Sequence, residues 1–127
     1  MNFNFIAGNN FDLNSFKDIE KFVNDYPDFQ TVFLNNEKEL SLLFELIGIP
    51  ETPSKDLNYP EFSKYWDLSA FKFPELNEKE FDQFYKNWIR QSARNNNMDE
   101  YGCLIFLQGL SKKWNKLNYR LVVVDYD

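Results

Sequence analysis

The sequence contains no histidine and a single cysteine, Cys103, among its 127 residues. Without histidine the chain cannot build a Ser-His or Cys-His nucleophile pair, an imidazole acid or base, or a zinc site of nitrogen and sulfur ligands. One cysteine also excludes an intramolecular disulfide framework, which fits a reducing compartment. We therefore expect no metal and no other cofactor, and a protein that binds a partner rather than an enzyme.

Glycine is scarce as well, and none of the four glycines lies in a dinucleotide-binding or P-loop frame. The spacing of a calcium-binding loop is also missing. Two carboxylates alone can hydrolyse a glycoside, but Glu78, Glu80 and Asp82 lie at an expected helix start, where acids complement the helix dipole. Nothing beside Cys103 in the sequence would stabilise a thiolate, so we expect a buried structural thiol there.

Long hydrophobic runs are absent too. The longest, residues 103–107, is far too short to cross a bilayer, and residues 1–8 lack the basic and apolar regions of a signal peptide. With 43% hydrophobic and 27% charged residues, the composition is typical of one globular domain. We expect a cytoplasmic protein that does not bind membranes.

Carboxylates are abundant, and they are unevenly distributed. Residues 1–82 hold 16 acidic and 7 basic residues, a net charge of −9, whereas residues 83–127 hold 4 acidic and 7 basic residues, a net charge of +3. An acidic field repels phosphate and speeds the association of cationic partners. We therefore expect a basic protein partner, such as a toxin or nuclease domain, and no direct binding of nucleic acid. The alternative is that the acidity serves solubility alone.

Aromatic residues are also abundant, at 19% of the chain, and six of them fall within residues 59–73. Rigid aromatic rings beside carboxylates are typical of interfaces that bind a basic partner. We expect this segment to be irregular and exposed. The alternative is a lid that seals one end of the core with its rings, in which Phe62, Trp66, Phe71 and Phe73 are buried while Tyr59 and Tyr65 are not. The candidate partner-binding residues are Tyr59, Glu61, Tyr65, Asp67 and Glu75.

The first half of the sequence predicts a strand and two helices. Residues 2–7 alternate as in a half-buried strand, and Asn14 or Ser15 caps a helix that reaches Tyr26, with Ile19 and Val23 in its apolar stripe. Residues 29–34 fit either a short strand or the start of the next helix. That helix begins after Asn36 and ends at Gly48, before Pro50. Residues 51–58 read as an exposed loop, and residues 60–66 as a possible short helix.

The second half predicts two helices and a strand. Asn77 and Glu80 form a capping pattern at the start of a helix with a clear apolar stripe, which frays into residues 95–97. Asp99 caps a further helix, whose residues 101–110 are apolar on nearly every side and are therefore expected to be deeply buried. Residues 119–126 form a strand, and its run of residues 121–124 has no polar alternate, which indicates an inner strand covered on both faces.

These elements predict one domain, residues 1–127, of the α+β or small α/β class. It is helix-dominated, with about four helices packed on a small sheet that contains the N- and C-terminal strands.

The two ends of the chain resemble ribonuclease inhibitors of the barstar family. Phe-Ile-Ala-Gly at residues 5–8 followed by Leu-Asn-Ser-Phe at residues 13–16 is similar to that family's opening strand, glycine turn and serine-capped helix. Residues 99–126 are similar to its closing helix and hydrophobic strand. The family's inhibitory block has no counterpart after Pro27, so no inhibitory residue is carried over. The resemblance implies a general likeness to bacterial immunity proteins, small acidic domains that neutralise a cognate toxin.

Three functions are left open by these observations. Small size, acidity and the absence of a catalytic set favour an immunity protein that covers the active site of a basic toxin, possibly a nuclease. A DNA-mimic inhibitor, such as an anti-CRISPR or anti-restriction protein, would use carboxylates in place of phosphates, but the seven basic residues after residue 82 count against it. A generic protein-interaction domain or an uncommon carboxylate enzyme is the third.

Overall fold

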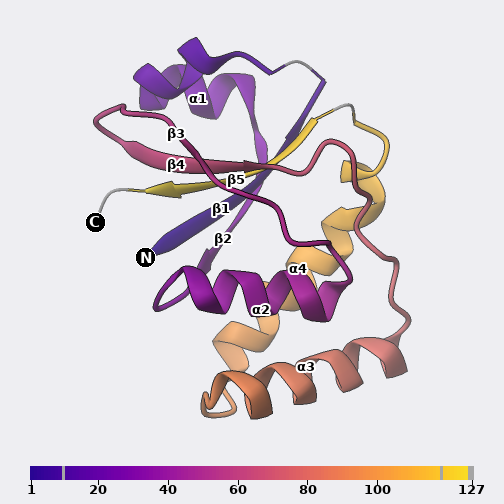
Figure 1. The fold of residues 1–127 in the computed structure, drawn as a ribbon. Coiled ribbons are helices and arrows are strands. Elements are labelled where there is room, and N and C mark those ends of the chain that lie inside the picture. The colour runs from indigo at the N-terminus through magenta and orange to yellow at the C-terminus, as the bar shows by residue number, and fades with distance from the viewer. Residues whose placement is uncertain (10, 118, 126–127) are drawn as a thin grey trace.

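The computed structural model describes residues 1–9, 11–117 and 119–125, and shows a five-stranded antiparallel sheet with helices on both of its faces (Figure 1). Its strands are β1 (Asn2–Gly8), β2 (Asp28–Phe33), β3 (Lys55–Asp56), β4 (Phe62–Asp67) and β5 (Tyr119–Asp125). Its helices are the 3-10 helix η1 (Leu13–Lys17) and the α-helices α1 (Ile19–Asp25), α2 (Glu37–Ile47), α3 (Glu78–Ser92) and α4 (Met98–Trp114). The expected α+β class is confirmed.

The first and last strands are neighbours in the middle of the sheet, whose strand order is β2-β1-β5-β4-β3. Val122 of β5 lies opposite Phe5 on one side and Trp66 on the other. Residues 121–124 are all at most 2% exposed, so the predicted inner strand, covered on both faces, is confirmed. Its predicted last residue, Tyr126, lies outside the described residues.

Each face of the sheet has its own core, because successive strand residues point to opposite faces. The larger core joins one face to α2, α3 and α4, and the smaller joins the other face to η1 and α1 (Figure 1). The larger core includes Phe3, Phe5, Val32, Trp66, Leu68, Trp88, Trp114, Val122 and Val124. The smaller core includes Ile6, Phe16, Phe22, Tyr26, Phe62, Tyr65, Leu121 and Val123.

Two helix starts are confirmed in atomic detail. Asn36 Oδ1 accepts a hydrogen bond from the Glu39 N–H at the start of α2, and Asn77 and Glu80 form a reciprocal capping box at the start of α3. Gly48 ends α2 in the left-handed region, at φ +92°, as its position before Pro50 predicts.

The helix expected over about residues 14–26 is two shorter helices, η1 and α1. Asp18 separates them, because its backbone is extended and its carboxylate accepts hydrogen bonds from two N–H groups in the first turn of α1. The break changes which side chains face the core. Ile19 and Val23, expected in the buried stripe, are 49% and 44% exposed.

Three strands lie where the sequence leaves the structure open or indicates another conformation. Residues 29–34, which fit either element, are mostly in β2, which pairs with β1. The expected loop over residues 51–58 contains β3. The expectation that residues 59–73 are irregular, with a short helix, is wrong over β4. There the pairing of Trp66 with Val122, across more than fifty residues, decides the conformation.

The apolar helix α4 is covered on one side only, so the expectation of burial all round is wrong. Leu104 is 1% exposed, whereas Ile105 and Phe106 are 44% and 56% exposed. The helix also begins earlier than expected, since Asn97 rather than Asp99 caps it: Asn97 Oδ1 accepts a hydrogen bond from the Asp99 N–H. None of the helices formed by the described residues is long and apolar enough to span a membrane.

Val122 is fully buried between β1 and β4. We expect Val122→Asp to unfold the protein at neutral pH, because a buried unpaired charge costs several kcal/mol, comparable with the ~5–15 kcal/mol that stabilises a domain. The same substitution at Val23, 44% exposed on α1, is the matched control and should cost less than about 1 kcal/mol. Circular dichroism and thermal melting compare the two. A wild-type melting temperature for Val122→Asp would contradict this picture of the sheet.

Candidate functional site

The five residues predicted to bind a partner are spread along β4 and its flanks. Glu61 lies in the turn before β4, with the half-buried Tyr59, and Asp67 is the last residue of the strand. The seven residues from Glu61 to Asp67 span about 20 Å in an extended chain. Glu75 lies beyond the strand, in the segment that leads to α3. The structure therefore does not bring these side chains together on one compact surface.

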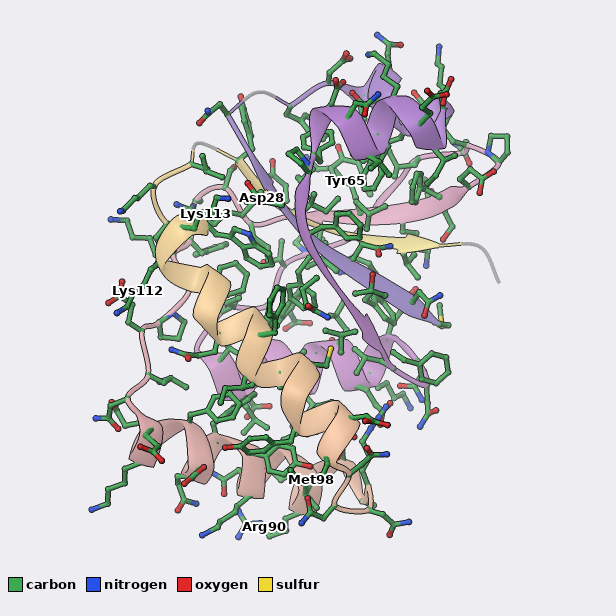
Figure 2. The ribbon with its side chains drawn as sticks, turned by 180° about the vertical axis from the view of Figure 1, so that it is seen from behind. Asp28, Tyr65, Arg90, Met98, Lys112 and Lys113 are labelled. Atoms are coloured by element: carbon green, nitrogen blue, oxygen red, sulfur yellow. The ribbon has the colours of Figure 1, made fainter. Side chains whose placement is uncertain are left out.

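Tyr65, expected on the surface, is only 8% exposed. It lies on the side of the sheet that α1 covers (Figure 2), and its ring centroid is 5.6 Å from that of Phe11. Of the aromatic residues that the lid alternative would bury, Phe62, Trp66 and Phe73 are buried and Phe71 is half-buried. Tyr65 belongs to the smaller core, and little of its side chain is exposed.

A different acidic cluster lies where α2, the segment after it and β4 meet, and its side chains line a groove of about 500 Å³. Phe44, Ile49 and Trp66, all at most 5% exposed, form the apolar part of the lining. We call this the acidic groove. Its carboxylates are those of Glu37, Glu45 and Glu51, and its hydroxyl groups are those of Ser41, Thr52 and Ser54.

Local structure explains how the acids of the groove come together. Glu37, Ser41 and Glu45 follow one another at four-residue spacing, which places them on one side of α2. The chain then reverses at the left-handed Gly48, and the segment after it returns Glu51 to the same groove. Trp66 approaches from β4, which is far away in the sequence.

The acidic groove carries excess negative charge. Lys64 Nζ lies 2.8 Å from Glu37 Oε1, and both side chains are about 40% exposed, so water screens this pair. Within the part of the chain that the structure describes, no lysine or arginine forms an ion pair with Glu45 or Glu51. Two carboxylates beside an apolar floor are therefore left to bind a cation from outside.

Glu45 stands in an unfavourable place for an acid. It lies in the last turn of α2, which has no basic residue, and a negative charge at a helix C-terminus opposes the helix dipole. Helix formation therefore does not account for a glutamate at this position. Residues that oppose a local preference, such as the preferred charge at a helix end, without stabilising the fold in another way are expected at functional sites.

The chemistry of the groove suits the binding of a cation. Carboxylates accept charge-assisted hydrogen bonds from lysine or arginine. The described residues contain no group of three or more metal-ligating side chains. Cys103 lies outside the groove, and burial raises the pKa of its thiol. It is half-buried rather than fully buried as expected, and its Sγ donates a hydrogen bond to the Thr31 carbonyl.

A larger groove, of about 620 Å³, lies between α3 and α4. It is lined by the rings of Tyr85 and Tyr101 and by Met98, with Lys86 and Arg90 among its charged side chains. Asp82, the acid that lines it, accepts a hydrogen bond from the Tyr101 hydroxyl. With two cations and one engaged carboxylate, this groove suits a basic partner less well than the acidic groove does.

Glu37, Glu45 and Glu51 are absent from the candidate set that the sequence suggests. The spacing of Glu37 and Glu45 on one helix face is visible in the sequence, as is the unfavourable position of Glu45. The contribution of Trp66 is not visible there, because it depends on the pairing of β4 with β5. Comparison of the chain with protein-family models, with curated proteins and with solved structures finds no match.

The position of Glu45 gives a prediction about stability. Glu45→Lys should leave the melting temperature unchanged or raise it, because a cation at this helix end contributes about 0.3–1 kcal/mol. Glu20 is the matched control, since it lies in the first turn of α1, where the dipole favours an acid. Glu20→Lys should therefore lower the melting temperature. Thermal melting at low ionic strength tests both, and a destabilised Glu45→Lys would mean that Glu45 has a structural role.

Proposed function

We propose that this protein is a protein-binding inhibitor, an immunity protein that neutralises a cognate basic toxin by covering the toxin's active site. The acidic groove is the observation that carries the proposal. It offers the unpaired carboxylates of Glu45 and Glu51 over an apolar floor that contains Trp66. A lysine or arginine side chain of the toxin occupies this groove in the complex.

The chemistry of a nuclease explains why such binding inhibits. Enzymes that act on nucleic acid hold phosphate groups with lysine and arginine side chains. An acidic groove that takes up one of these cations competes with phosphate for it. The net charge of −9 over residues 1–82, which include the whole groove, supports the proposal because it speeds the approach of a basic domain. The barstar-like ends of the sequence agree with the same function.

The test begins with the gene immediately upstream of this chain's gene, which the proposal expects to encode a toxin-domain protein. Co-expression of the wild-type chain should restore the growth of cells that produce this toxin. The double variant Glu45→Lys/Glu51→Lys should lose protection, and at low salt its association rate with the purified toxin should fall at least about tenfold. Added salt should reduce the difference, because it screens the steering field.

The matched control is Glu61→Lys/Glu75→Lys, which changes the net charge equally at two exposed positions of the first candidate set. It should retain protection and most of the association rate. Loss of protection in this control alone would place the interface at the turn before β4 or in the segment before α3, and would overturn the acidic groove. Failure of the wild-type chain to protect against the toxin would overturn the inhibitor function itself.

A further inference from the structure

The solvent-facing side of α4 is an apolar stripe that no other described part of the chain covers. Met98 is 77% exposed, Ile105 44% and Phe106 56%, and Gly102 and Gly109 have nothing within 4 Å of the position of a Cβ atom. Figure 2 shows α4 lying across the molecule, with Met98 at one end and Lys112 and Lys113 near the other. Exposed apolar stripes on helices mark interaction surfaces.

The sequence spacing of this stripe is that of a helix-pairing face. Met98, Gly102, Ile105 and Gly109 recur at intervals of four, three and four residues, so they lie in line along one side of the helix. Residues at this spacing pack against a second helix, and the glycines let its backbone come close. The opposite side of α4, which includes Leu104 and Leu107, is occupied by the larger core.

We propose that α4 pairs with the α4 of a second copy of this chain, in antiparallel orientation, to form a two-fold symmetric dimer. The order of residues along the stripe carries this assignment. With the symmetry axis between residues 105 and 106, Ile105 of each copy lies opposite Phe106 of the other. In the same register Gly102 lies opposite Gly109, so that the two helices come close at both positions.

The charges at the two ends of α4 complement each other in this register. Asp99 in the first turn and Lys112 in the last turn are both exposed, and in this register the first turn of each helix lies alongside the last turn of the other. Met98 lies opposite the aliphatic stem of Lys113, whose ammonium group is held 2.7 Å from Asp28 Oδ1. A parallel pair would instead place like charges together at each end.

This dimer does not rest on the inhibitor function, because α4 contributes no residue to the acidic groove. The larger core separates the groove from the solvent-facing side of α4, so the dimer leaves the acidic groove of each copy open. A two-fold dimer of an inhibitor would bind two toxin molecules. A pair of 17-residue helices is a small interface, so we expect a dissociation constant on the order of 10 µM.

Sedimentation velocity over 1–500 µM tests the dimer. The wild-type chain should shift from monomer to dimer over this range, and Ile105→Asp should remain monomeric. Ile19→Asp is the matched control, since Ile19 is 49% exposed on α1 and lies away from the stripe. It should dimerise like the wild type. A wild-type chain that stays monomeric at 500 µM, or an Ile105→Asp variant that dimerises normally, would overturn the proposal.

A charge swap tests the antiparallel register. Asp99→Lys and Lys112→Asp should each weaken dimerisation about threefold or more, because each places like charges near one another at both ends of the symmetric interface. The double variant Asp99→Lys/Lys112→Asp should recover most of the wild-type affinity, since the attraction is restored with exchanged signs. Circular dichroism confirms that each variant is folded. A double variant that dimerises no more tightly than either single variant would overturn the antiparallel register.

Discussion

The buried guanidinium of Arg120 joins the parts of the structure on which the acidic groove depends. It is 5% exposed and donates hydrogen bonds to the carbonyls of Trp114 and Asn115, at the end of α4, and of Ser69 and Phe71, after β4. All four acceptors are backbone carbonyls. The N–H groups of one planar guanidinium therefore connect two chain segments by hydrogen bonds. Burial lowers its pKa, yet arginine stays charged in proteins. The cation also complements the dipole of α4.

This junction fixes where the chain after β4 lies relative to β5 and the end of α4. Leu68 N–H donates to the Arg120 carbonyl, so the chain leaving β4 is held beside β5. The register of β4 in turn places Trp66 opposite Val122, on the face of the sheet that α2 covers. Trp66 can then form part of the groove whose carboxylates come from α2 and the segment after it. The same junction ties the C-terminal end of α4 to the sheet, while its solvent-facing stripe stays uncovered.

The sequence predicts what local rules decide. The caps at Asn36 and Asn77 and the inner strand of residues 121–124 follow from side-chain chemistry and hydrophobic patterning, and the structure confirms them. Hydrophobic patterning does not predict the conformation of a segment that is decided by pairing with a distant strand. This is the case for β4, whose partner β5 lies more than fifty residues away in the sequence. It also fails in α4, because apolar residues all round a helix indicate burial, and they do not show which side the fold leaves open. The acidic groove contains features of both kinds. The spacing of Glu37 and Glu45 on one helix can be found in the sequence, whereas the position of Trp66 depends on long-range strand pairing.

A crystal structure of this protein bound to the proposed toxin tests the central claim most directly. The account predicts a lysine or arginine side chain of the toxin in the acidic groove, with its nitrogen atoms within hydrogen-bonding distance of the carboxylates of Glu45 and Glu51, and the toxin's phosphate-binding site covered. A complex in which the groove stays open to solvent, while the toxin contacts the turn that holds Tyr59 and Glu61, would contradict the account.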